Sequence, residues 1–185
     1  MRLLMKIIGF LLVCASFPSF GTQDDLRLDA LFSELHNASS GSEAREIEKN
    51  IWEIWFEGPN EQVDQYFESA QIAASGGDYR SATTALDKLI DAHPEFAEGW
   101  NQRAIVYFVQ GKYSAALADV DKTLSLEPRH FGAASGKAQC YLALGEPLAA
   151  IDAFEQALSI NPWLEDVKEQ LNQLKAIHLN PRNAI

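Results

Sequence analysis

Cysteine is scarce in this chain, because only Cys14 and Cys140 among 185 residues carry a thiol. Cys14 lies in an apolar N-terminal stretch, so removal of that stretch leaves Cys140 alone and excludes an intramolecular disulfide. Stability must then come from side-chain packing, for which 47% of the residues are hydrophobic. Cys140 lies in a segment with helical periodicity, where we expect a small buried hydrophobic residue rather than a reactive thiol.

Positive charge is also scarce. The chain has 15 Lys and Arg residues against 26 Asp and Glu residues, which gives a formal net charge of −11. The basic residues are scattered singly, whereas a nucleic-acid binder needs a clustered basic surface to displace phosphate counterions. The composition therefore argues against nucleic acid as a partner and disfavours binding to anionic membrane surfaces.

Catalytic and metal-binding motifs are missing as well. The sequence contains no glycine-rich phosphate loop and no HExxH, GxSxG or CxxC pattern. No two histidines are spaced as metal ligands on one helical face. The four histidines are His36, His93, His130 and His178. We expect each of them at the surface or at a helix end, and we expect neither enzyme activity nor a metal or cofactor.

The apolar N-terminal run over 7–15 is too short to span a bilayer comfortably. Arg2 and Lys6 precede this run, and a small-x-small pattern ends at Gly21, as in a secretory signal peptide that is cleaved there. The sequence thus predicts export to the periplasm, and an uncleaved N-terminal membrane anchor is the alternative. Lipidation of Cys14 fits only in part, because the residue before it is not small.

What the sequence does contain is a repeat with a period of 34 residues. Five columns of similar residues share this spacing, which is hard to obtain by chance. The columns are Pro94, Pro128 and Pro162; Gly77, Gly111 and Gly145; Ala82, Ala116 and Ala150; Ala70, Ala104 and Ala138; and Tyr79 and Tyr113, from which Pro147 departs. A fixed period of this length indicates stacked units that bury their hydrophobic faces against one another.

In its period and its columns, the chain resembles the tetratricopeptide repeat family, in an exported bacterial form. The resemblance implies an all-α solenoid of antiparallel helix pairs with a C-terminal capping helix. Alanines allow the two helices of a pair to approach, and glycine ends the first helix with a positive φ. The expected division is a signal peptide at 1–21, a degenerate helical hairpin at 22–62, repeats at 63–96, 97–130 and 131–164, and a capping helix with a tail at 165–185.

The hairpin before the repeats has helical periodicity over 24–37 and 43–57, and we interpret it as a degenerate first repeat. Trp52 and Trp55 are three residues apart and share a helical face. We favour a core role, in which this pair seals the hairpin against the first full repeat. An aromatic anchor for a partner is the alternative.

Two polar features interrupt the apolar pattern. Arg103 occupies a column where the family usually has leucine, and we predict that it pairs with Asp119 or Asp121 across the hairpin. That pairing would be structural rather than catalytic. The junction Arg129-His130-Phe131 is interpreted as solvated, and binding of an anion is the alternative.

The resemblance also implies where a partner binds, because the first helices of such repeats line the concave side. Family members that hold the C-terminal carboxylate of chaperones use Lys and Arg there, whereas this sequence has Phe, Gln and Gly. We therefore predict a groove of amides and apolar side chains that holds an extended peptide by its main chain. The predicted groove residues are Phe67, Gln71, Asn101, Gln102, Ile105, Phe108, Ser135 and Gln139. Packing of this surface against the N-terminal hairpin is the alternative.

These observations predict a non-catalytic adaptor or scaffold that binds an unidentified partner protein or peptide in its concave groove. The alternative is a structural envelope or assembly factor that acts through self-association. One fold serves unrelated tasks, so the identity of the partner and the oligomeric state do not follow from the sequence.

Overall fold

The computed structural model describes residues 25–178, so the predicted signal peptide and the last residues of the expected tail lie outside the described part. Within this range the chain forms helices and no strand, which confirms the all-α class. The helices are α1 (Leu26–Asn37), α2 (Gly41–Phe56), α3 (Glu61–Ser75), α4 (Tyr79–Ala92), α5 (Ala97–Val109), α6 (Tyr113–Leu126), α7 (Phe131–Ala143), α8 (Pro147–Ile160) and α9 (Glu165–His178).

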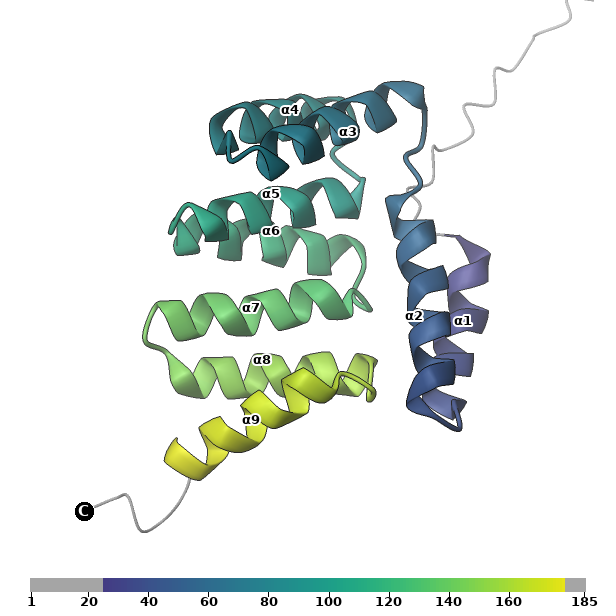
Figure 1. Ribbon diagram of the computed structural model, residues 1–185, viewed down its shortest axis with the longest axis vertical. Helices are drawn as coiled ribbons and strands as arrows, with labels where there is room; N and C mark the ends of the chain where they lie inside the picture. The colour runs from purple at the N-terminus through teal and green to yellow at the C-terminus, as the bar shows by residue number, and fades with distance from the viewer. Residues whose placement is uncertain (1–24, 179–185) are drawn as a thin grey trace, which may run out of the picture.

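Antiparallel helix pairs stack into one column, α3 with α4, α5 with α6 and α7 with α8 (Figure 1). Consecutive pairs contact each other through α4 and α5 and through α6 and α7. At the end of the column α9 lies against α8, and its Val167 and Leu171 are buried in the same core cluster as the α8 side chains. The predicted solenoid with a C-terminal capping helix is therefore confirmed.

Each pair turns at a glycine with a left-handed backbone, with φ of +79° at Gly77, +73° at Gly111 and +77° at Gly145. Residues with a Cβ atom adopt this conformation only at a steric cost, whereas glycine adopts it freely. The first turn is closed by the Asp78 N–H, which donates to the carbonyl of Ala73 at 2.9 Å. The glycine column of the sequence thus reflects a backbone conformation that recurs every 34 residues.

The alanine columns lie inside the helix pairs. In each pair the two alanines belong to one core cluster, as Ala104 and Ala116 do together with Val120. None of these alanines is more than 4% exposed. The set comprises Ala70, Ala82, Ala104, Ala116, Ala138 and Ala150. Because a close-packed interior has few voids, a larger side chain in these columns would force the two helices apart.

Ion pairs link successive helix pairs. Arg103 donates to both carboxylate oxygens of Asp119 at 2.8 Å, which confirms the predicted pairing across the hairpin. Its Nη1 atom also donates to Asp87 of the preceding pair at 2.8 Å. The hydrogen bonds to Asp119 raise the pKa of Arg103 above its ordinary value. Lys137 reaches Asp121 of the pair before it at 2.7 Å, so the same link recurs one repeat later.

The hairpin of α1 and α2 does not stack as a further repeat, and the interpretation as a degenerate first repeat is wrong. It stands beside the column and crosses the ends of the stacked helices (Figure 1). The core shared by α1 and α2 includes Phe131 of α7, with Ile160, Trp163 and Leu164 packed at its edge. The aromatic face of α2 therefore packs against apolar side chains at the junctions between repeats.

Trp55 is the centre of this docking surface and is only 1% exposed. Its ring stacks on His130, with ring centroids 4.2 Å apart and an interplanar angle of 7°. Trp163 adds a second attachment, because its indole N–H donates to the carbonyl of Leu35 at 3.0 Å. The predicted core role is confirmed for Trp55, whereas Trp52 is only partly buried. Both rings pack against the start of α7 rather than the first full repeat.

Candidate functional site

A hollow of about 230 Å³, here named the central hollow, opens between α5 and α7. Side chains of α2 and α6 complete its walls. The apolar part of the wall consists of Trp52, Ala104, Ile105, Phe108, Val120 and Cys140. Ile105 is 49% exposed, so the hollow offers apolar surface to the solvent at its mouth. Exposed apolar surface that is gathered in a concavity is typical of a binding site.

Two glycines of α7 shape the central hollow. A Cβ atom on Gly136 would meet nothing within 4 Å, so the missing side chain leaves open space in the wall. A Cβ atom on Gly132 would lie only 2.6 Å from Cη2 of Trp52. Gly132 therefore allows Trp52 to close one end of the hollow, and Gly136 keeps its middle open.

A second and much smaller hollow of about 20 Å³ lies between α3 and α5. Phe67, Gln71 and Gln102 line it. Phe67 is 8% exposed and contacts Phe56 and Phe96, with ring centroids 5.7 and 6.4 Å away. The side chain expected to anchor a peptide at this end is thus mostly core, and the space beside it is too small for a further side chain.

The amides expected to hold a peptide are turned toward a buried carboxylate instead. Glu98 is 1% exposed, and both of its oxygens accept hydrogen bonds from Asn101, at 3.1 and 3.2 Å. Gln102 donates to the same carboxylate at 2.6 Å. A buried charge needs such donors to offset its lost hydration. These two amides therefore serve the interior of the protein.

His130 is the third donor to Glu98 and is completely buried, so of the two expected places, the surface or a helix end, only the second applies. Its Nδ1 atom accepts the N–H of Ala133 at 3.0 Å and caps the N-terminus of α7. A backbone N–H can only donate, so the ring proton lies on Nε2 and is donated to Glu98 at 2.9 Å. The expected place at a helix end is confirmed, and the junction is not solvated at His130.

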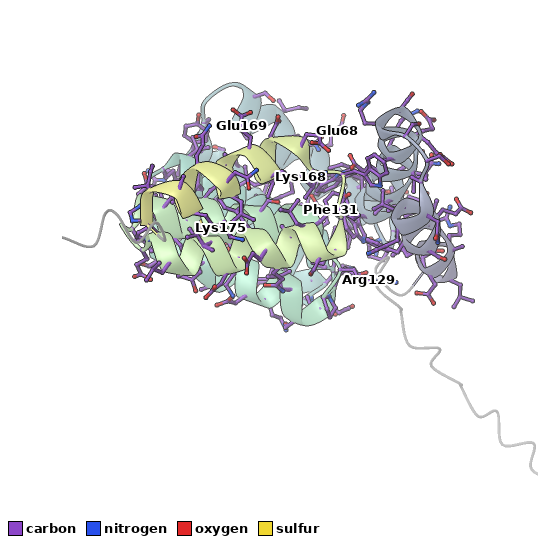
Figure 2. The ribbon with its side chains drawn as sticks, turned by 90° about the horizontal axis from the view of Figure 1, so that it is seen from below. Glu68, Arg129, Phe131, Lys168, Glu169 and Lys175 are labelled. Carbon is purple, nitrogen blue, oxygen red and sulfur yellow. The ribbon has the colours of Figure 1, made fainter. Side chains whose placement is uncertain are left out.

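The Arg129 side chain is 34% exposed, so the junction is solvated at this residue, but its guanidinium is engaged by carboxylates rather than open to an anion. Its guanidinium pairs with Glu127 at 2.9 Å and with Asp29 of α1 at 2.6 Å. The hydrogen bond to Glu127 raises the pKa of Arg129. In Figure 2, Arg129 and Phe131 lie where the hairpin meets the column. No sequence pattern predicted this role, because the partner Asp29 is 100 residues away.

The predicted groove residues fall into three groups. Asn101, Ile105, Phe108 and Gln139 meet at the central hollow, whereas Phe67, Gln71 and Gln102 line the smaller one. Ser135 lines neither hollow and donates to the carbonyl of Phe131 at 2.9 Å. Trp52 and Cys140 were not expected in the wall, and Trp52 comes from outside the repeats, where their register gives no guidance.

Within 25–178, no group of three or more His, Cys, Asp and Glu side chains is arranged to hold a metal ion. Over the same residues, no helix combines the length and apolar character needed to cross a membrane. The thiol of Cys140 lies against the central hollow, and burial raises its pKa to about 11. A thiol with such a pKa is a poor nucleophile at neutral pH.

Comparison with known families gives a match to the tetratricopeptide repeat over residues 67–122 and 101–162, which together span about half of the chain. A curated TPR repeat-containing protein from Rhizobium etli is 30% identical over 120 residues. That alignment covers 58% of this chain and 59% of the relative, so the chain spans less than two thirds of the relative's length.

Solved structures with the same arrangement of helices include the first TPR domain of Spaghetti (RPAP3), bound to the HSP90 peptide SRMEEVD, with a TM-score of 0.61 and 21% identity. The alignment covers 64% of this chain and 94% of that domain. The MamA protein has a TM-score of 0.58 and 22% identity, with 63% of each chain covered. The TPR2B domain of yeast Sti1, in complex with Hsp70, has a TM-score of 0.57 and 20% identity, with 63% of this chain and 95% of that chain covered. At these identities the likeness concerns the fold alone.

Proposed function

Because this chain belongs to the tetratricopeptide repeat family, we propose that it is a non-catalytic adaptor that binds a segment of a partner protein in its concave groove. The observation that carries the proposal is the central hollow, which leaves Ile105 half exposed and presents the open backbone of Gly136. When a partner side chain covers this apolar surface and removes it from water, the free energy of binding improves by about 25 cal/mol per Å² buried.

The mode of binding differs from the one expected from the sequence. Asn101 and Gln102 already donate to Glu98, and Gln139 donates to Gln170 at 2.7 Å. Few amide donors of the groove are left for the main chain of a peptide. We therefore assign recognition to an apolar side chain of the partner that enters the central hollow, with the extended segment running across α5 and α7.

Photocrosslinking tests this proposal. A benzophenone side chain at Phe108, in the wall of the central hollow, is expected to capture a defined protein from an extract of the source cells. The same group at Leu148 of α8, which is 58% exposed and outside the hollow, serves as the matched control and is expected to capture no such protein. Blocking the hollow by Gly136→Trp is expected to abolish capture at Phe108, while Gly136→Ala preserves it.

The alternative, an envelope or assembly factor that self-associates, predicts different products. Capture of a second copy of this chain alone, at Phe108 or at Leu148, would favour self-association. Equal capture at both positions, or capture that survives Gly136→Trp, would contradict binding in the groove.

Export to the periplasm is part of the proposal and rests on the sequence pattern of residues 1–21. Cell fractionation with N-terminal mass spectrometry tests it. A mature chain that begins at Thr22 is the expected result, and a chain that retains Met1 in the membrane fraction would support the uncleaved anchor instead.

A further inference from the structure

We infer that the segment bound in the groove carries one large apolar side chain with Lys or Arg residues beside it. This inference rests on the proposed function and adds the chemical class of the partner. It follows from the size of the central hollow and from the charges that surround it.

The central hollow matches one large side chain. Its volume of about 230 Å³ exceeds the ~150 Å³ of an engineered cavity that holds a benzene molecule, so a phenylalanine or leucine side chain fits. Trp52 and Phe108 stand in its wall and offer ring faces and edges to such a group. The open backbone at Gly136 lets the main chain of the segment approach closely.

The groove around this hollow is acidic. The wall residues that α5 and α7 contribute have equivalents on α3 and α9, in the 34-residue register. Among all these positions none is Lys or Arg, whereas five are acidic: Asp64, Glu68, Glu98, Asp166 and Glu169. Glu98 is buried and satisfied by its three donors, so the other carboxylates set the charge that a partner meets.

Three of these carboxylates are exposed. Within 25–178, no Lys, Arg or His forms an ion pair with Glu68, Asp166 or Glu169. Glu169 accepts only the amide of Gln173, at 3.2 Å. Glu68 lies on α3 and Glu169 on α9, so the negative charge flanks the central hollow on both sides along the column.

The basic side chains of the first helices are directed elsewhere. Arg103 and Lys137 pair with aspartates of the second helices, and Lys175 of α9 pairs with Glu155 of α8 at 2.6 Å. Figure 2 shows Glu68 and Glu169 near one edge of the molecule, with Lys168 and Lys175 of α9 closer to its middle. Lys168 pairs with Glu165 of its own helix at 2.6 Å. A cationic segment is therefore attracted to the groove, and an acidic one is repelled.

Fluorescence anisotropy with defined peptides tests the inference on the whole mature chain. Three labelled decapeptides carry one central phenylalanine in a Gly and Ser background, flanked by four Lys, four Ser or four Glu residues. The peptide SRMEEVD, found with the Spaghetti domain, serves as a natural acidic comparison. The Lys-flanked peptide is expected to bind at least about tenfold more tightly than the Ser-flanked one, and the two acidic peptides more weakly still.

Charge reversal separates the local effect from the net charge. The double variant Glu68→Lys with Glu169→Lys is expected to weaken binding of the Lys-flanked peptide about tenfold and to remove most of its salt dependence. The matched control, Asp91→Lys with Asp152→Lys, changes the net charge equally at exposed positions on α4 and α8, and it is expected to change binding less than threefold. Circular dichroism confirms that both variants fold.

The outcomes distinguish the two proposals. Equal binding of the Lys-, Ser- and Glu-flanked peptides that Gly136→Trp abolishes would overturn the charge inference and leave groove binding intact. Binding that survives Gly136→Trp, or no binding of the Lys-flanked peptide at millimolar concentration, would overturn the inference, and the crosslinking experiment then decides on groove binding. A dimer in sedimentation that Gly136→Trp dissociates would show that a second copy occupies the hollow, which also overturns it.

Discussion

At the scale of single residues, the Glu98 and His130 pair explains how a carboxylate is tolerated in the interior. Three side chains donate to Glu98, and His130 also caps α7 and stacks on Trp55. One imidazole thereby connects the second pair of helices, the third pair and the α1–α2 hairpin. Its neutral form suffices, since one ring nitrogen accepts and the other donates.

Replacement of His130 is expected to be severe. His130→Ala removes one hydrogen-bond donor from the buried Glu98 carboxylate and the acceptor of the Ala133 N–H, and each buried group left unsatisfied costs about 1–3 kcal/mol. Urea denaturation measures the loss. His130→Asn restores an acceptor for the Ala133 N–H, so this variant is expected to recover about 1 kcal/mol. A loss below about 1 kcal/mol for His130→Ala would contradict the structural role.

Cys140 provides a second prediction at this scale. With its pKa raised to about 11 by burial, only roughly one native thiol in a thousand is ionised at pH 8. Reaction with a thiol reagent is expected to be at least about 100-fold slower than for free cysteine, and urea is expected to restore the rate. A fast native reaction at pH 8 would refute the buried placement.

The same pKa shift determines the direction in which folding stability changes with pH. The folded state holds the Cys140 proton to about pH 11, while the unfolded chain releases it near the ordinary value of 9.0. Between these values the folded state binds more protons, so folding stability falls as the pH rises through this window. Cys140→Ala is expected to lack this contribution to the pH dependence.

At the scale of elements, α7 differs from the other helices by its two glycines. Gly136 lies in the helix interior, where glycine costs about 0.5–1 kcal/mol relative to alanine. Gly132 lies in the first turn and leaves room for Trp52, whereas the missing Cβ atom of Gly136 faces open space and the structure shows no packing role for it.

The different surroundings of the two glycines predict that a change to alanine has opposite effects on stability at 132 and at 136. Gly136→Ala is expected to stabilise the protein by about 0.5–1 kcal/mol, and Gly132→Ala to destabilise it by about 1–3 kcal/mol because Trp52 must shift. Thermal denaturation of the two variants, side by side, measures both signs. A destabilised Gly136→Ala variant would show that the space at Gly136 is filled by a neighbouring side chain.

At the scale of the whole molecule, the α1–α2 hairpin packs across the ends of the stacked helices and connects successive repeats. Trp55 is its buried anchor, whereas the ion pair of Arg129 with Asp29 lies at the surface. The hairpin also contributes Trp52 to the central hollow, so the shape of the proposed binding site depends on the position of the hairpin.

Two hairpin variants are expected to differ in size of effect. Trp55→Ala empties the centre of the docking surface and is expected to cost about 3–5 kcal/mol, with faster hydrogen exchange in α1 and α2. Asp29→Asn breaks only an exposed pair and is expected to cost less than about 1 kcal/mol. Similar losses in both variants would mean that the hairpin is held by charge rather than by apolar packing.

The repeat array could be predicted from the amino-acid sequence. Glycines with positive φ, alanines inside each pair and the Arg103 pairing with Asp119 all follow from local backbone rules and from the 34-residue register. Within a register, each unit contacts only its neighbours, so local patterns carry the information. Four of the predicted groove residues also lie together in the wall of the central hollow.

Other features depend on tertiary packing and could not be predicted from the sequence. The place of the hairpin, the burial of His130 and the engagement of Asn101 with Glu98 depend on side chains from distant segments. Outside the repeats, no 34-residue register indicates which surface a side chain packs against, and Trp55 could cover more than one apolar surface of the repeats. Which one it covers depends on shape and on the polar groups that must be satisfied there, and these arise only when the whole chain is packed.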